Sequence, residues 1–195
     1  MGIVYITLCH NGDNEICDSA KGNSEHNGLS MFGCKVVHEM NRQGIMIDLS
    51  HASEKTFWDV LALSESPVFT SHSSVKALCN HPRNLSDEQI KALAAQGGVV
   101  QLCLYDFFLS QRGSSDIHTV IRHIDYIVNL IGIDYVGIGS DFDGGGGIPG
   151  CENASQLINI TIELLRKGYS PTDIKKLWGE NFLRVLETVQ NKAKN

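Results

Sequence analysis

The feature of this sequence that most constrains its fold is a repeated alternation of two kinds of segment. Short extended runs rich in apolar and β-branched residues are each followed by a polar loop and then by a stretch with helical periodicity. Runs such as Ile45-Met46-Ile47 are apolar at every position, which is typical of parallel strands covered on both faces. The alternation therefore predicts parallel βα units. The predicted strands span residues 3–9, 45–50, 68–71, 99–105 and 135–140.

Helix start and stop signals occupy the stretches between these strands. Ser30, Ser53 and Ser86 are each followed by a helix-period segment, as expected of N-cap residues. Pro171 directly follows Ser170, a position suited to the first turn of a helix. The predicted helices run from 30 to about 43, from 53, from 86 to about 97, from 116 to 130, from 155 to about 168, from 170, and from 181 to about 192.

Composition limits the classes of protein and partner to consider. The chain has 195 residues, 42% of them hydrophobic, which is enough for a core of its own and predicts one domain over residues 1–195. A net charge of -6 argues against a nucleic-acid partner. No apolar run approaches the roughly 18 residues of a membrane span, and no signal peptide is recognised. The six dispersed cysteines are expected to be buried free thiols, which suits a cytoplasmic location.

Residues able to bind a metal or transfer a proton follow four of the five predicted strands. These residues are His10, His51, His72 and Asp141. A single histidine at a strand end is more often structural, and Asp141 alone could cap the glycine-rich turn at 144–147. Four equivalent positions favour a shared active site, because the carboxyl ends of barrel strands lie on one face. Imidazole and carboxylate groups without thiolates favour a hydrolytic, zinc-like ion.

A series of short motifs resembles the membrane (renal) dipeptidase family over essentially the whole chain. The motifs occur in the same order and with compatible spacing, so together they are far more specific than any one alone. They are His10-Asn11-Gly12-Asp13-Asn14, Gly28-Leu29-Ser30, Asn41-Arg42, Asp48-Leu49-Ser50-His51, Ser71-His72-Ser73-Ser74, Arg83-Asn84, Gly139-Ser140-Asp141-Phe142-Asp143-Gly144 and the C-terminal Trp178-Gly179-Glu180-Asn181-Phe182-Leu183-Arg184-Val185.

The resemblance implies a binuclear zinc hydrolase on a (β/α)₈ barrel that cleaves dipeptides with a free C-terminal carboxylate. In the family, the histidines matching His51 and His72 bind one of the two metals. The histidine matching His10 contacts the scissile carbonyl and stabilises the oxyanion. The arginine matching Arg83 binds the substrate carboxylate, a role suited to a planar guanidinium. The aspartate matching Asp141 exchanges a proton with the attacking water and the departing amine.

The chain also departs from the family pattern, because its start matches the fourth barrel strand. Family members carry an N-terminal His-x-Asp pair and a bridging glutamate on earlier strands. About five parallel βα units, at about 40 residues each, match strands 4 to 8 of a TIM-type barrel and predict a partial domain. We therefore expect at most one weakly held zinc and an activity that is impaired or absent in this chain alone. The edge of strand 3–9 is expected to pair with a second copy or with a missing N-terminal half.

Two alternatives to dipeptidase activity stay open. The chain could be a non-catalytic barrel remnant that self-associates, or another barrel hydrolase of the lactonase or phosphotriesterase type. The His-Pro-Arg-Asn segment at 81–84 favours the dipeptidase, since a neutral ester has no carboxylate to bind. Asp48 and Asp143 are expected to be supporting or turn residues. The remaining histidines are expected on loops or helix faces: His26, His38, His81, His118 and His123.

Overall fold

The five predicted strands form one parallel sheet. The computed structural model describes residues 2–193, and the strand order in the sheet is β1-β2-β3-β4-β5. Tyr5 of β1 pairs with Met46 of β2 at one edge of the sheet, and Val100 of β4 pairs with Val136 of β5 at the other. The prediction of an α/β fold with five parallel βα units is confirmed. The strands are β1 (Tyr5–Thr7), β2 (Met46–Asp48), β3 (Phe69–Ser73), β4 (Val99–Leu102) and β5 (Val136–Ile138).

Helix boundaries follow the capping residues named from the sequence. The Ser30 side chain accepts a hydrogen bond from the Gly33 amide, and Asp116 forms a reciprocal capping box with Thr119. The helices are α1 (Met31–Gln43), α2 (Glu54–Leu63), α3 (Asp87–Ala95), α4 (Asp106–Leu109), α5 (Ile117–Ile131), α6 (Ile158–Arg166), α7 (Pro171–Lys175) and α8 (Asn181–Ala193). Within residues 2–193, none of these helices is long and apolar enough to cross a membrane.

Several details differ from the sequence prediction. The strands β1, β2, β4 and β5 are shorter than the predicted segments 3–9, 45–50, 99–105 and 135–140. The short helix α4 was not predicted. The helix expected from residue 155 begins instead with a 3-10 turn, Ala154–Gln156, and continues as α6. His72 was placed after its strand but lies within β3, because the backbone pairing continues through Ser73, whose carbonyl accepts from the Cys103 amide at 3.1 Å.

The chain divides into two compact units. The first comprises the described residues of Met1–Thr70, Ala92–Val99 and Phe182–Asn195, and the second comprises Ser71–Lys91 and Val100–Asn181. Strands β3 and β4 each contribute residues to both units. The expectation of a single partial-barrel domain stays a prediction.

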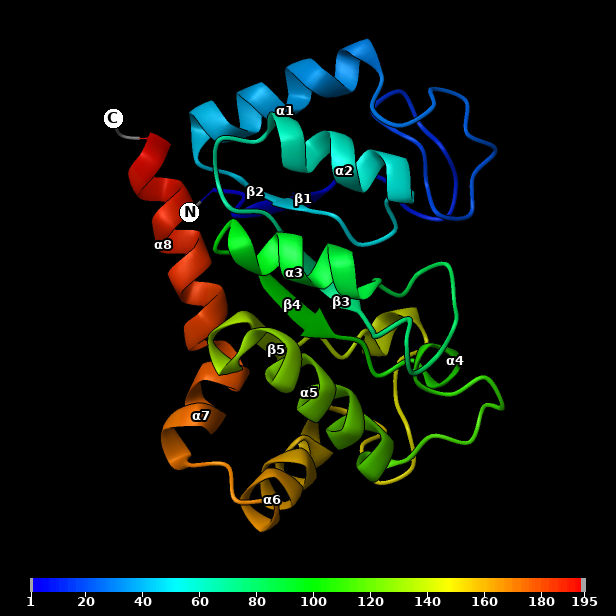
Figure 1. The fold of residues 1–195 in the computed structure, drawn as a ribbon, viewed down its shortest axis with the longest axis vertical. Helices are drawn as coiled ribbons and strands as arrows, with labels where there is room; N and C mark the ends of the chain where they lie inside the picture. Colours follow the sequence, from blue (N-terminus) through cyan, green and yellow to red (C-terminus); the bar gives the residue numbers. More distant parts are fainter. Residues whose placement is uncertain (1, 194–195) are drawn as a thin grey trace. The chain divides into compact units, whose positions relative to one another are not determined.

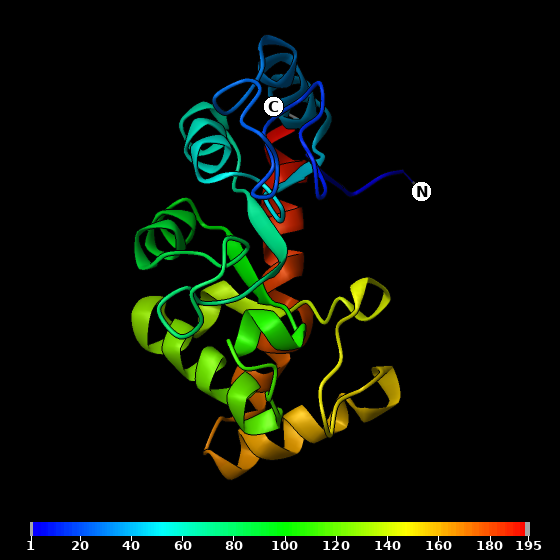
Figure 2. The ribbon, with the colours of Figure 1, turned by 90° about the vertical axis from the view of Figure 1, so that its right-hand side faces the viewer.

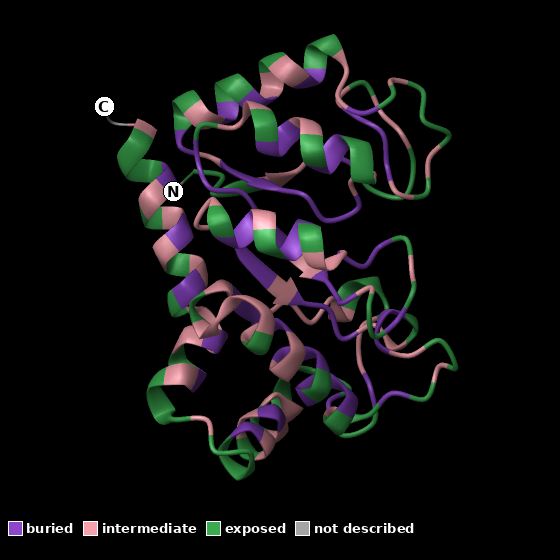
Figure 3. Ribbon diagram, viewed as in Figure 1, coloured by how far each residue is buried: buried purple, intermediate pink, exposed green. Residues whose placement is uncertain are grey.

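In the first unit, α8 covers the ends at which the strands begin. Met46, Phe69 and Val99, the first residues of β2, β3 and β4, form a buried cluster with Val185 and Val189 of α8. The ring of Tyr5, the first residue of β1, meets the Phe69 ring edge-on at 5.3 Å. Helices α1 and α2 lie side by side next to β1 and β2 (Figure 1). Buried positions alternate with exposed ones along both helices (Figure 3).

In the second unit, α5 packs beside α6, as both views of the ribbon show (Figures 1 and 2). The side-chain amide of Asn181 donates to the carbonyls of Ile133 and Val136, at 2.7 and 2.8 Å, and so fixes the start of β5. Trp178, in the turn before α8, donates its indole N–H to the Thr161 hydroxyl at 2.8 Å. The C-terminal motif therefore holds β5 through Asn181 and contacts α6 through Trp178.

Candidate metal and substrate site

Two of the predicted site histidines lie together at the carboxyl ends of β1 and β2. The ring centroids of His10 and His51 are 4.4 Å apart, with the ring planes tilted by 38°. His10 is exposed, whereas His51 is 8% exposed. Their proximity follows from the parallel pairing of β1 with β2, which brings the two strand ends to the same edge of the sheet.

The backbone that carries these histidines is fixed by buried polar groups. The carboxylate of Asp48, on β2, accepts hydrogen bonds from the Thr7 hydroxyl at 2.6 Å and the Ser50 amide at 2.9 Å. The Ser19 hydroxyl donates to the His10 carbonyl at 2.6 Å, and the Ala20 amide donates to the His51 carbonyl at 2.7 Å. Asp48 is thus a supporting residue, and the loop after β1 links the backbones of His10 and His51.

That loop is organised around two aspartates. The buried carboxylate of Asp18 accepts from the backbone amides of His26 and Gly28, at 2.9 and 2.7 Å. Asp13 accepts from the amides of Ser19 and Asn23, and these backbone hydrogen bonds, that of Ser19 first, hold the pKa of Asp13 below its usual value. The loop is therefore held by its own side chains beside the strand end.

In the second unit, the structure brings Arg83 to the backbone of His72. One guanidinium nitrogen of Arg83 donates to the His72 carbonyl at 3.3 Å, and Arg83 is only 4% exposed. The His72 Nδ1 atom lies 2.7 Å from the Ser71 hydroxyl, a hydrogen bond that fixes the orientation of the imidazole. The planar guanidinium of Arg83 is suited to binding an anionic group of a substrate.

Asp141 follows β5, and its side chain meets a buried thiol. The Cys103 Sγ lies 3.8 Å from the Asp141 carboxylate as a hydrogen-bond donor. Burial, with a smaller contribution from the Asp141 charge, raises the pKa of Cys103 to about 12, so the thiol keeps its proton. The glycine-rich turn is capped by the Asp141 backbone carbonyl, which accepts from the Gly144 and Gly146 amides. The Asp141 side chain makes no cap hydrogen bond, so turn capping does not account for the carboxylate.

Two of the predicted site residues have a strained backbone. His51 and Asp141 have φ angles of 71° and 67°, and only Ser24 and Asn27 share a positive φ among the described non-glycine residues. Left-handed backbone is costly for residues with a Cβ and tends to persist at functional sites. A Cβ at Gly144 would lie 2.4 Å from an Asp141 carboxylate oxygen, which explains a glycine there. The strain is a structural signal for these residues that the sequence did not carry.

The donor chemistry of the predicted metal ligands, His51 and His72, fits a zinc-like ion, because imidazoles are common zinc ligands. Within residues 2–193, no group of three or more His, Cys, Asp or Glu side chains is placed to hold a metal. His10 and His51 belong to the first unit, and His72, Arg83 and Asp141 to the second. Convergence of all five on one site stays a prediction.

Three of the other histidines differ in their surroundings. The His26 Nε2 lies 2.8 Å from the Asn14 carbonyl, and the His118 side chain is 71% exposed. His123 is buried, with Nε2 3.1 Å from the Leu109 carbonyl and Nδ1 accepting from the Val75 amide. Burial lowers the pKa of His123 to about 4, so it is neutral at pH 7.

Sequence comparison identifies the family. Residues 1–195 match the model of a family described as "Membrane dipeptidase (Peptidase family M19)". The dipeptidase aclJ of Aspergillus oryzae is 40% identical over 199 residues, covering 100% of this chain and 47% of the relative. The dipeptidase tcpJ of Claviceps purpurea is 37% identical, covering 99% of this chain and 46% of the relative. The chain thus spans about half the length of the curated relatives it matches.

Solved structures agree with this result. The probable dipeptidase PvdM of Pseudomonas aeruginosa has a TM-score of 0.94 at 29% identity, covering 98% of this chain and 64% of that protein. A metallopeptidase of Rhodobacter sphaeroides, liganded with a phosphinate mimic of the dipeptide L-Ala-D-Ala, has a TM-score of 0.80 at 35% identity, covering 84% of this chain and 48% of that protein. The chain belongs to the membrane dipeptidase family, peptidase family M19.

Proposed function

We propose that this chain supplies the C-terminal part of a zinc-dependent dipeptidase that hydrolyses dipeptides with a free C-terminal carboxylate. The observation that carries the proposal is the His10 and His51 pair, with ring centroids 4.4 Å apart at the ends of adjacent strands. The strained backbone of His51 supports a functional role for this pair, because packing alone gives no reason to maintain a positive φ there. Family membership supports the reaction type.

In the proposed reaction, each residue has a separate task. When bound, zinc would polarise the scissile carbonyl and lower the pKa of an attacking water. His51 and His72 would hold one metal through their imidazoles. Exposed His10 would donate a hydrogen bond to the carbonyl oxygen as negative charge develops there. Arg83 would bind the substrate carboxylate, and Asp141 would carry a proton from the water to the departing amine.

Metal content tests the ligand assignment. We expect His51→Ala and His72→Ala each to lower the zinc bound per chain, as measured by mass spectrometry after dialysis against zinc. His118→Ala is the matched control, because its exposed side chain has no place in the proposed site. Zinc occupancy that stays at the wild-type value in both ligand variants would contradict the assignment.

The proposed binding of the substrate carboxylate by Arg83, which we call the carboxylate clamp, is tested with paired substrates. We expect Arg83→Ala to raise KM strongly for free dipeptides such as glycyl-leucine and little for the C-terminally amidated forms. An equal change for both substrates would exclude the clamp. This comparison also separates a dipeptidase from a lactonase-type hydrolase, which has no use for a carboxylate.

We also propose that this chain needs further βα units for full activity. The ligands that the family places on earlier strands, the His-x-Asp pair and the bridging glutamate, are absent from this sequence, which leaves two histidines for one metal. We expect the chain alone to bind at most one zinc weakly and to turn over glycyl-leucine slowly or not at all. Two tightly bound zinc ions with rapid turnover by this chain alone would overturn the proposal.

The surface beside β1 supports docking of such units. Tyr5 and Val4 are exposed at β1, and an apolar groove between β1 and α1 is lined by residues that include Ile6, Phe32 and Val36. The curated relatives are about twice as long as this chain, so we propose a preceding βα segment of the family fold as the occupant. A homodimer is the competing occupant.

Sedimentation of the chain with an N-terminal fragment of a relative tests this docking. We expect a one-to-one complex that Val36→Asp, which places a charge in the groove, abolishes. Met31→Asp is the control, because Met31 lies on the same helix but is 82% exposed and does not line the groove. A homodimer that persists and excludes the fragment would contradict the assignment.

The six free cysteines, five of them buried, support a proposed cytoplasmic location.

A further inference from the structure

The guanidinium of Arg83 lies over an aromatic ring. The guanidinium carbon is 5.3 Å from the centroid of the Phe108 ring, and both residues are buried, at 4% and 6% exposure. A cation over a ring face is attracted by the ring quadrupole, and the attraction is larger when the pair is removed from water. Phe108 therefore provides a specific support for the Arg83 side chain, which the sequence motifs did not reveal.

The Phe108 ring is itself held in place by two other rings. The His81 ring centroid is 4.5 Å from that of Phe108, and the Tyr105 ring meets Phe108 edge-on at 4.8 Å. His81 also accepts the backbone N–H of Arg83 on its Nδ1 atom, at 3.1 Å. The same histidine thus contacts both the ring under the guanidinium and the backbone that carries it.

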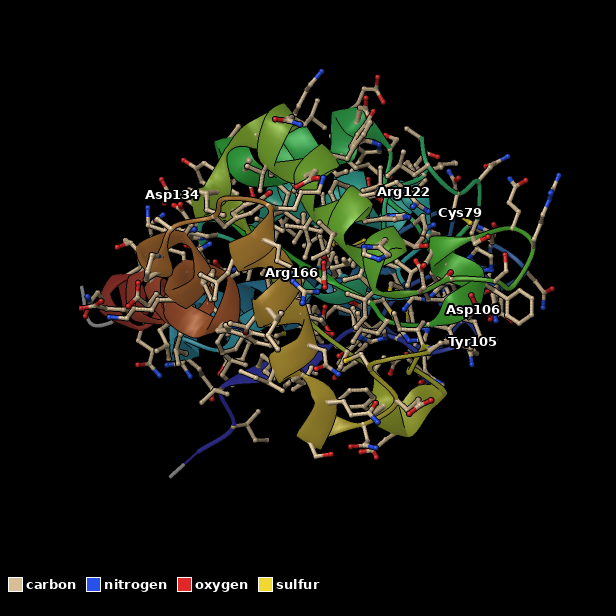
Figure 4. All side chains as sticks on the ribbon, turned by 90° about the horizontal axis from the view of Figure 1, so that it is seen from below. Cys79, Tyr105, Asp106, Arg122, Asp134 and Arg166 are labelled. Carbon is tan, nitrogen blue, oxygen red and sulfur yellow. The ribbon has the colours of Figure 1, made fainter. Side chains whose placement is uncertain are left out.

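Hydrogen bonds from side chains to backbone carbonyls join the Arg83 loop to α4. The Asn84 side-chain amide donates to the Cys79 and Phe108 carbonyls, each at 2.8 Å. The Cys79 thiol donates to the Phe107 carbonyl at 3.3 Å. Figure 4 labels Cys79 on the same side of the view as Tyr105 and Asp106, which lie at the start of α4. These hydrogen bonds therefore tie the loop to the four-residue helix and hold the ring beneath the guanidinium.

We propose that Phe108 is a positioning residue that orients Arg83 for binding the substrate carboxylate. The inference rests on the proposed function, because it assigns the support of the clamp and not the clamp itself. A guanidinium group that is already oriented loses less conformational freedom when it forms two hydrogen bonds to a carboxylate. Removing the ring should weaken carboxylate binding selectively, while contacts elsewhere on the substrate are retained.

Equilibrium binding of two probes tests the proposal without turnover. Glycyl-leucine and its C-terminal amide are titrated calorimetrically into the whole protein in the presence of a chelator. We expect Phe108→Leu to weaken binding of the free dipeptide about tenfold, equivalent to about 1.4 kcal/mol, and to change amide binding less than about twofold. Phe108→Tyr, which retains the ring, should stay near wild type. Phe107→Leu is the matched control, since Phe107 lies on the same helix but is 53% exposed.

NMR spectroscopy reports directly whether the Arg83 guanidinium lies over the Phe108 ring. In the wild type, the ring current of Phe108 should shift the Arg83 side-chain N–H resonances upfield, and Phe108→Leu should remove that shift. Phe108→Met, which also lacks a ring, replaces the leucine variant if the latter fails to fold. Equal weakening of both probes would reduce Phe108 to a structural role and overturn the proposal.

The experiment separates failure of this inference from failure of the proposed function. If Arg83→Ala abolishes the preference for the free carboxylate while Phe108→Leu leaves it intact, the clamp stands and the positioning role is refuted. If Arg83→Ala also leaves the preference intact, Arg83 does not bind the carboxylate, and both the clamp and the inference fail.

Discussion

The buried histidine His123 predicts a specific loss of stability in acid. Its imidazole is 1% exposed, Nδ1 accepts the Val75 amide, and Nε2 lies against the Leu109 carbonyl. Burial is the main cause that lowers its pKa to about 4, from 6.5 for a free imidazole, and the nearby charge of Arg122 adds to the effect. The hydrogen bond to Leu109 acts in the opposite direction but is outweighed.

The direction of the effect follows from proton linkage. As pH falls below about 6.5, the unfolded chain takes up a proton at His123 that the folded chain does not, so the free energy of unfolding falls. The full loss, reached as pH approaches 4, is about 3 kcal/mol at about 1.4 kcal/mol per pKa unit. Between pH 7.5 and pH 5 the expected loss is about 2 kcal/mol.

Urea unfolding with a chelator present, at pH 7.5, 6 and 5, measures this loss. We expect His123→Asn to be less stable than wild type at pH 7.5, because hydrogen bonds to Val75 and Leu109 are disturbed. Its stability should then depend less on pH, so the difference from wild type shrinks by about 2 kcal/mol at pH 5. His118→Gln is the control on the same helix, since the His118 side chain is 71% exposed and its contact with Glu163 is long, at 3.9 Å. Identical pH dependence in wild type and His123→Asn would refute the reasoning.

Three further outcomes can be measured on the same protein. Asn181→Ala should lower the free energy of unfolding by about 2 to 4 kcal/mol in urea, because it leaves two backbone carbonyls beside β5 without their donor; a change below about 0.5 kcal/mol would contradict this. Phe69→Ala should cost about 3 to 5 kcal/mol by opening a cavity in the buried cluster under α8, and an unfolding midpoint equal to wild type would refute it. Native chain should react rapidly with a thiol reagent at Cys34 alone, since the other five cysteines are buried; a second fast thiol would overturn that expectation.

Local signals in the sequence predicted most of the helices and strands. The features that the sequence did not predict depend on tertiary contacts. The caps Ser30 and Asp116 and the apolar strand runs act within a few residues, so they are visible in the sequence. The extension of β3 through His72 depends on pairing with a segment about 30 residues away. Helix α4 has four residues, too few for a periodic pattern, and is held through Asn84. His123 was expected on a loop or helix face, and its burial, at 1% exposure, became visible only in the packed structure.

The candidate site shows the same division between local and distant information. The strand-end pattern indicated His10 and His51, and the parallel register of β1 and β2 explains why they meet. The hydrogen bond from the Cys103 thiol to Asp141 connects residues 38 positions apart, and no local motif predicts it. The left-handed backbone of His51 likewise depends on the surrounding fold and not on residue type.

Within the first unit, stability and the proposed chemistry are assigned to opposite ends of the strands. The cluster of Met46, Phe69 and Val99 under α8 lies where the strands begin, whereas His10 and His51 follow the strand ends. His10 is exposed and adds little packing to the core, whereas His51 is buried but lies outside the cluster under α8. Substitutions under α8 should therefore lower the free energy of unfolding with little change in zinc content, whereas His51→Ala, which removes a proposed ligand, should lower the zinc content. A barrel scaffold that separates these roles tolerates changes of site residues without losing its fold.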